Sequence, residues 1–144
     1  VDRHCTICHS TVVIPIRLTF QPGIPIFEQV VFAARKAVVS GQLKAGDAFP
    51  SVRALSTALK INPNTAHKVI IHLTNEGVLE VRPGIGTLVA EARAVGREER
   101  GRMVRAQLEQ LAVDARRLGF SLSELQDELA AEWRRLDPVE EAKA

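Results

Sequence analysis

Two short amphipathic helices that follow each other closely within residues 51–77 are the feature that most constrains the fold. The later helix has a clear start, because Asn62 is a typical N-capping residue. Pro63 suits the first helical position, where a backbone N–H would have no acceptor within the helix. Its apolar positions recur with the spacing i, i+3, i+4, i+7 at Ala66, Val69, Ile70 and Leu73. The earlier helix is capped by Ser51, and its apolar positions are Val52, Leu55 and Leu59. Because only a few residues around Ile61 separate them, the two segments predict a helix-turn-helix.

A β-hairpin is predicted directly after this helix pair. Residues 79–82 alternate apolar and polar side chains, residues 83–86 are rich in turn formers, and residues 87–89 supply a second strand. A helix-turn-helix followed at once by a hairpin is a winged helix. A further helix is expected between Pro25 and Gly41, with apolar residues Ile26, Phe27, Val30, Val31, Ala34, Ala37 and Val38 at helical spacing.

Beyond Ala90 the chain reads as two more helices. Val104, Leu108, Leu111, Ala115 and Leu118 recur in steps of four and three, which is a heptad-like spacing. Ser121 and Glu124 have the spacing of a capping box and open a last helix, expected to bury Leu122, Leu125, Leu129, Trp133 and Leu136 before Pro138 ends it. The expected fold class is therefore mainly α (α+β): a winged helix-turn-helix domain, residues 14–90, followed by a two-helix C-terminal arm, residues 91–144.

The arm is expected to pair two copies of the chain. A helical hairpin that carries two apolar stripes cannot bury both of them on itself. We therefore expect a homodimer, with the interface formed by Val104, Leu108, Leu111, Leu118, Leu125, Leu129 and Trp133. The alternative is that the arm folds back and packs on the winged helix, since apolar stripes of this kind are usually part of a core.

Length, composition and charge narrow the class of protein. A chain of 144 residues accommodates one domain and a short appendage, and its 46% apolar and 25% charged residues are ordinary globular values. No apolar run approaches the ~18–20 residues of a membrane span, and the opening residues have no secretory pattern. We therefore expect a cytoplasmic protein with no membrane partner. Residues 1–90 carry a net charge of +4 and residues 91–144 a net charge of −2, so the first part is the candidate for a polyanionic partner.

The motif residues of the predicted winged helix resemble the GntR family of bacterial transcription regulators. The resemblance runs from Gly41-x-Leu43 through Gly46-Asp47-x-Phe49-Pro50-Ser51-x-Arg53-x-Leu55, then Asn62-Pro63-Asn64-Thr65, Glu76-Gly77-x-Leu79 and Gly84-x-Gly86-Thr87. It covers residues 25–90. The start of the third expected helix, at Asn62-Pro63-Asn64-Thr65, together with the short arm, looks most like the YtrA-type branch. The resemblance implies a DNA-binding domain, an operator read by a dimer, and repressor activity. Better-known members carry arginine at the positions of Pro63 and His67.

Seven residues are candidates for contacts with DNA. Arg53 lies on the second helix, away from Val52 and Leu55, where a guanidinium can reach a phosphate or a guanine edge. The start of the third helix enters the major groove in this motif, and a basic side chain and a bare backbone in the wing can approach the sugar-phosphate chain. The predicted contacts are Arg53, Asn64, Thr65, His67, Lys68, Arg82 and Gly84.

Residues 1–13 are a leader that we expect to be poorly ordered. They contain His4-Cys5-Thr6-Ile7-Cys8-His9, whose Cys-x-x-Cys-His pattern is shared by c-type haem attachment sites. Haem attachment requires export, and a zinc site requires four ligands around one ion, whereas the chain has no second cysteine pair. No metal and no cofactor are therefore expected. A thiol- or metal-responsive sensor that uses Cys5 and Cys8 is the alternative.

The predicted function is sequence-specific DNA binding by a transcriptional regulator, a repressor that binds a palindromic operator in double-stranded DNA as a homodimer. An enzyme is not expected, because the sequence has no phosphate-binding loop, nucleophile elbow or Ser/His/Asp grouping. A winged helix used only for protein–protein assembly is the other alternative. The 54 residues after Ala90 are too few for a separate effector domain, and the sequence identifies no small-molecule effector.

Overall fold

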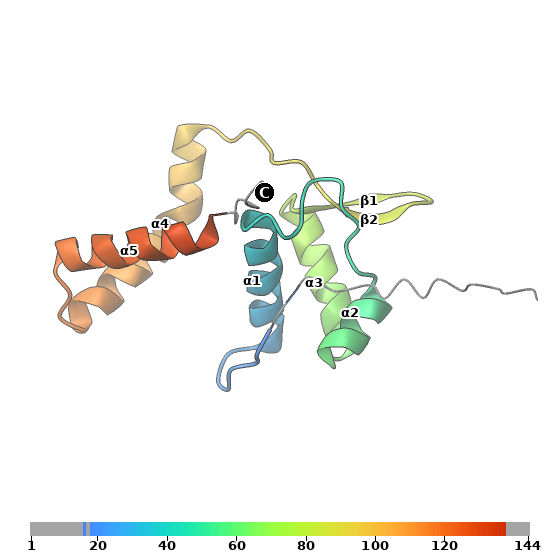
Figure 1. Ribbon diagram of the computed structural model, residues 1–144, viewed down its shortest axis with the longest axis horizontal. Coiled ribbons are helices and arrows are strands. Elements are labelled where there is room, and N and C mark those ends of the chain that lie inside the picture. The colour runs from blue at the N-terminus through green and yellow to red at the C-terminus, as the bar shows by residue number, and fades with distance from the viewer. Residues whose placement is uncertain (1–15, 17, 138–144) are drawn as a thin grey trace, which may run out of the picture.

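The structure, a computed structural model, describes residue 16 and residues 18–137. Its elements in chain order are α1 (Ile26–Val39), α2 (Val52–Leu59), α3 (Pro63–Asn75), β1 (Leu79–Arg82), β2 (Gly86–Val89), α4 (Arg97–Arg117) and α5 (Leu122–Leu136). Figure 1 shows α1, α2 and α3 as one bundle, with the hairpin β1–β2 projecting from one side and the arm α4–α5 extending on the other. Within the described residues, no helix is both long and apolar enough to cross a membrane. The mainly α winged helix-turn-helix with a C-terminal helical arm is confirmed.

The core lies where α1, α2 and α3 meet. The predicted stripe of α3 is buried throughout, and Leu55 of α2 and Val30 of α1 are fully buried against it. One polar side chain joins this core: Gln29 accepts a hydrogen bond from the backbone N–H of Gln21 at 2.8 Å and donates to the carbonyl oxygens of Gln21 and Ile24. The burial of Gln29 costs little because its amide is hydrogen-bonded. By contrast, Ile26, which we expected in the apolar stripe, is exposed.

Local capping defines both helices of the helix-turn-helix. The Ser51 hydroxyl accepts from the N–H of Ala54, and the Asn62 side chain accepts from the N–H of Asn64 at 2.8 Å. Both residues are the N-caps that the sequence predicts, and Pro63 occupies the first position of α3. Lys60 ends α2 in the left-handed conformation with φ 54°. The Ser56 hydroxyl then donates to the carbonyl oxygen of Ile61 across the turn.

The wing is an antiparallel hairpin with a third, minimal strand beside it. Leu79 pairs with Val89 and Arg82 with Gly86, so the predicted hairpin is present. Its second strand begins at Gly86, which the sequence analysis placed in the turn. A single bridge joins Ala48 to Leu88, and the N–H of Phe49 donates to the carbonyl oxygen of Thr87 at 2.8 Å. This bridge was not predicted, since it joins segments 40 residues apart. It anchors the hairpin to the segment that leads into α2.

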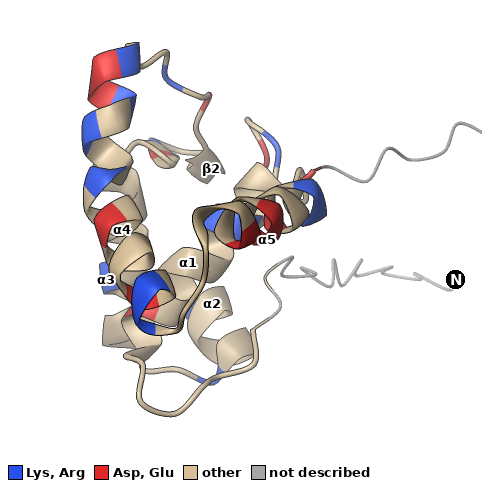
Figure 2. Ribbon diagram, turned by 90° about the vertical axis from the view of Figure 1, so that its left-hand side faces the viewer, with Lys and Arg blue, Asp and Glu red and all other residues tan. Residues whose placement is uncertain are grey.

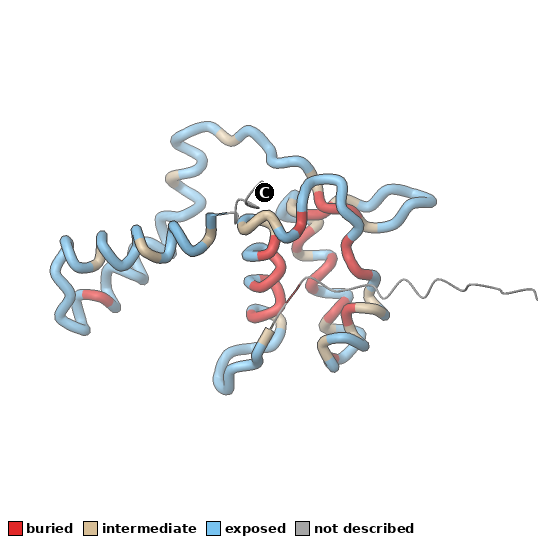
Figure 3. The backbone as a smooth tube through the Cα atoms, in the orientation of Figure 1, coloured by how far each residue is buried: buried red, intermediate tan, exposed pale blue. Residues whose placement is uncertain are grey.

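The arm is almost entirely exposed. Ala115 is its one buried residue among the described positions, and α5 contains none. Figure 3 shows the buried residues concentrated in α1–α3 while both arm helices are exposed along their length. The prediction that the last helix buries Leu122, Leu125, Leu129, Trp133 and Leu136 is therefore wrong for the single chain, because α5 diverges from α4 instead of packing along it. The capping box of Ser121 and Glu124 is confirmed.

Candidate nucleic-acid interface

The outer face of α3 presents three of the predicted contacts. With Ala66, Val69, Ile70 and Leu73 turned into the core, Asn64, His67 and Lys68 are left exposed near the start of the helix. Ile71 is also exposed on this side, one turn further on, and the sequence analysis did not single it out. The sequence could have indicated Ile71, because it lies three residues after Lys68 and therefore on the same side of the helix. Together these residues make a surface with an amide, an imidazole, an ammonium group and an apolar side chain.

Thr65 lies at the edge of that face nearest to α1. It is half-buried and lines a cavity of 530 Å³ with Phe27 and His72, and Lys68 and Ile71 line the same cavity. The rings of Phe27 and His72 meet edge to face, with their centroids 5.3 Å apart. The side of α3 that carries Thr65 is therefore directed toward α1, whereas the side that carries His67 is directed away from it.

The end of α3 is held to α1 by charge. Both Nε and Nη2 of Arg35 donate to the carboxylate of Glu76, and Nε2 of His72 lies 3.2 Å from the same carboxylate. The hydrogen bonds from Arg35, together with its positive charge, hold the pKa of Glu76 below its usual value of 4.5; the neighbouring His72 acts in the same direction and burial opposes it. This clamp joins residues 41 positions apart, and the sequence analysis missed it.

Arg53 is exposed on α2, as predicted, next to the capped N-terminus of that helix. Arg82 is exposed in the wing, but its guanidinium Nη2 lies 2.7 Å from the Glu80 carboxylate, so the wing's cation has an internal partner. Gly84 lies at the tip with φ 78°, a conformation that favours glycine, and a Cβ there would meet no atom within 4 Å. The apolar residues Val81 and Ile85 complete the exposed surface of the hairpin.

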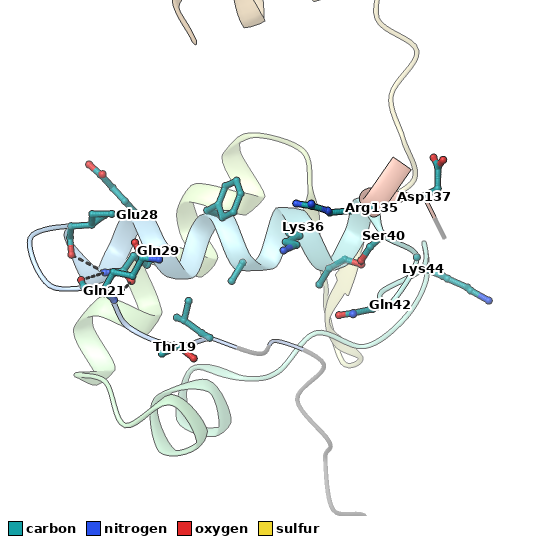
Figure 4. A pocket seen from close by; sticks show the side chains of 16 residues that line it. Thr19, Gln21, Glu28, Gln29, Lys36, Ser40, Gln42, Lys44, Arg135 and Asp137 are labelled. Atoms are coloured by element: carbon teal, nitrogen blue, oxygen red, sulfur yellow. Dashed lines mark hydrogen bonds between the residues drawn. The ribbon is translucent and has the colours of Figure 1, made fainter. Parts of the chain in front are cut away.

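A second cavity lies away from α3. It has a volume of 1230 Å³ and lies between the outer side of α1 and the end of α5. Figure 4 shows Gln21 and Gln29 at one end of it and Ser40, Lys44 and Asp137 at the other. No three His, Cys, Asp or Glu side chains in the described part of the chain are grouped to hold a metal ion. The leader, with Cys5 and Cys8, lies outside the described residues.

Known proteins resemble this chain in both sequence and fold. The family described as "Bacterial regulatory proteins, gntR family" matches residues 27–89. The chain is 35% identical over 113 residues to the HTH-type transcriptional repressor YtrA of Bacillus subtilis (strain 168), which covers 78% of this chain and 87% of that protein. It is 31% identical over 106 residues to the uncharacterized HTH-type transcriptional regulator YhcF of the same organism, with 74% of this chain and 88% of that protein covered.

Among solved structures, a transcriptional antiterminator from Listeria monocytogenes EGD-e superimposes with a TM-score of 0.73 at 27% identity. The match covers 86% of this chain and 97% of that one, so it includes the arm as well as the winged helix. The curated relatives are transcriptional regulators and not enzymes. The chain belongs to the gntR family of bacterial regulatory proteins as a YtrA-like, DNA-binding transcriptional regulator.

Proposed function

We propose that this regulator is a repressor that binds a palindromic operator as a homodimer. The observation that carries the proposal is the exposed face of α3. Asn64, His67 and Lys68 are exposed near the start of this helix, and that end enters the major groove in this motif. The relative YtrA is named a repressor, which supports the sign of the regulation. Because the proposed ligand is operator DNA, we also propose that the protein is cytoplasmic.

Each candidate residue has a distinct role in this proposal. Asn64 and His67 read base edges in the major groove, and Lys68 neutralises a phosphate. Arg53 reaches a phosphate or a guanine edge from α2, and Thr65 supports the start of α3 from the side that faces α1. Arg82 and Gly84 bring the wing against the sugar-phosphate chain.

Two copies are needed because one recognition helix reads only a few base pairs, which is too few for operator-level specificity. In the proposal, residues 14–90 form the DNA-binding domain and residues 91–144 the dimerisation arm. The interface is formed by the apolar residues Val104, Leu108, Leu111, Leu118, Leu125, Leu129 and Trp133. Leu125 is half-buried in the single chain, and the other six are 41–70% exposed. Two-fold symmetry then predicts half-sites about one helical turn, ~10 base pairs, apart.

The test is selection of binding sites from a random-sequence duplex library, followed by footprinting on the DNA upstream of the chain's own gene. We expect an inverted repeat in the selected sequences and a protected region containing it. On that duplex, Arg53→Ala should weaken binding by about 1–3 kcal/mol because a base or phosphate contact is lost. Arg93→Ala, which removes an exposed arginine from the linker before α4, is the matched control and should bind as the wild type does. Selection of no common sequence would contradict the proposal.

A further inference from the structure

Ile71 is an exposed apolar residue in the middle of the outer face of α3. Its side chain is 45% exposed and is not part of the buried core cluster. Because the helix has 3.6 residues per turn, Ile71 and Lys68 lie on the side opposite the buried stripe. A single exposed apolar residue is ordinary on a protein surface. This one, however, lies within the surface that is proposed above to meet DNA.

The spacing of this face is that of a helix that reads base edges. Four of its residues stand at positions i, i+3, i+4 and i+7, which lie on one side of a helix: Asn64, His67, Lys68 and Ile71. Homeodomains contact DNA in the major groove with four residues of their recognition helix at this same spacing. Ile71 occupies the fourth position, ~10 Å along the helix axis from Asn64. The two residues therefore meet different base pairs.

The charge of the helix-turn-helix favours a nucleic acid over a protein as the partner of Ile71. Residues 51–75 contain no acidic residue and three basic ones, Arg53, Lys60 and Lys68. In Figure 2, α2 carries no red band, whereas α4 and α5 both do. An apolar side chain within a basic surface that has no carboxylates is suited to lie against a polyanion.

Thymine is the base that offers an apolar group to such a side chain. Its C5-methyl group lies in the major groove, where the other bases present hydrogen-bond donors and acceptors. Isoleucine has neither a donor nor an acceptor, so against the other bases it would cover polar groups and leave them without a partner. Against thymine it buries apolar surface on the methyl group instead. An isoleucine at a base-reading position therefore distinguishes thymine from the other three bases.

We propose that Ile71 of each copy contacts the C5-methyl group of one thymine in its half-site and so selects a thymine–adenine pair there. This proposal rests on the operator binding proposed above and specifies one base of the site. In it, Ile71 contributes specificity, whereas Lys68 beside it neutralises a phosphate and contributes affinity for every duplex.

Replacement of thymine by uracil tests this contact, because uracil differs from thymine only in lacking the methyl group. The full chain is titrated by fluorescence anisotropy against the duplex obtained by site selection, with each thymine of one half-site, on either strand, replaced in turn. We expect one replacement to weaken binding of the wild type about fourfold, the effect of one buried methyl group. The same replacement should leave the affinity of Ile71→Ala unchanged, although this variant binds the original duplex more weakly. Ile71→Val should keep most of the uracil effect, since it keeps a branched apolar side chain.

Two control variants separate this contact from a general loss of affinity. Lys68→Ala on the same face should bind every duplex more weakly but keep the uracil effect of the wild type. Val39→Ala shortens another exposed apolar side chain, at the last position of α1, and should bind each duplex as the wild type does. Because Ile71 is exposed, Ile71→Ala should also keep the circular dichroism spectrum of the wild type.

The outcomes distinguish the thymine contact from operator binding itself. If wild type and Ile71→Ala respond alike to uracil at every position of a selected inverted repeat, the contact is overturned and operator binding stands. A wild type that tolerates uracil at every thymine overturns the contact too, as does a selected half-site without a thymine on either strand. If no common sequence is selected, the operator binding proposed above is refuted instead.

Discussion

At the scale of single residues, the internal partner of a cation determines how much it contributes to DNA binding. Lys68 makes no ion pair with any residue that the structure describes, whereas Arg82 lies 2.7 Å from the carboxylate of Glu80. A cation that must leave a carboxylate to contact a phosphate gains less binding free energy than a cation that gives up only water and counterions. The two candidates are therefore not equivalent, although the sequence presents both as exposed basic residues.

We expect Lys68→Ala to weaken binding to all duplexes alike and to reduce the slope of log affinity against log salt by about one. Arg82→Ala should reduce the slope less, because Glu80 already balances its charge. Glu80→Gln should increase affinity for every duplex, since it frees Arg82 and removes a negative charge beside the DNA. Fluorescence anisotropy at several salt concentrations measures all three. Equal changes of slope for Lys68→Ala and Arg82→Ala would contradict the role of the ion pair.

At the scale of elements, α3 is fixed at both ends by different interactions. Asn62 caps its start through the N–H of Asn64, and Glu76 ties its end to Arg35 of α1. The cap is local, and the clamp is tertiary. Each interaction gives its own prediction for the stability of the fold.

Asn62→Ala should lower the free energy of unfolding by about 1 kcal/mol, because an N–H at the start of α3 loses its acceptor. Asn62→Asp should keep most of the stability, since aspartate is an equally good cap. Asn64→Ala is the matched control: it should change stability by less than about 0.5 kcal/mol while weakening DNA binding. Urea denaturation followed by circular dichroism measures the first effect. A loss of stability in Asn64→Ala as large as in Asn62→Ala would argue against the cap.

Glu76→Gln should cost about 0.5 kcal/mol at neutral pH, a small value because both Glu76 and Arg35 are partly exposed. The pKa of Glu76 is lowered in the folded chain, so its carboxylate stabilises the fold above its usual pKa of 4.5. That contribution is lost as the pH falls through the lowered value. Thermal unfolding of wild type and variant should therefore differ at pH 7 and converge in acid, with Glu91→Gln in the linker as the control. A difference that persists in acid would contradict the clamp.

At the scale of the whole molecule, the chain has one packed unit and one exposed arm. The winged helix has its own core, whereas α4 and α5 bury only Ala115 among the described residues. The stability of the first part is therefore expected to be independent of the second. In the proposed homodimer, by contrast, DNA affinity depends on the arm, because binding to two half-sites needs both copies.

Leu111→Asp combined with Leu129→Asp should convert the dimer into a monomer in sedimentation, because each change buries a carboxylate in the interface. Affinity for the selected duplex should collapse, while a fragment of residues 14–90 should stay folded by circular dichroism. Val113→Asp is the control, since Val113 is also exposed, at 59% against 41% for Leu111, but lies on the opposite face of α4. A double variant that is monomeric and still binds the duplex as tightly as the wild type would refute the dimer requirement.

The features that the sequence determined by itself are those set within one or two helical turns. The caps at Ser51, Asn62 and Ser121 and the buried stripe of α3 depend on neighbours a few residues away, and all of them are as predicted. The hairpin follows for the same reason, because the short turn between Arg82 and Gly86 joins strands that are neighbours in the sequence. These local signals were enough to identify the winged helix and the outer face of α3.

Only the tertiary structure decided which surfaces meet. The Arg35–Glu76 clamp and the bridge of Ala48 to Leu88 join residues whose proximity depends on how α1, the segment before α2 and the wing pack. The same holds for the arm: periodicity showed that Leu129 and Trp133 share one side of a helix, but not that this side is exposed in the single chain. An apolar stripe specifies a face, whereas the surface that covers it is set by packing between distant parts of one chain or between two chains.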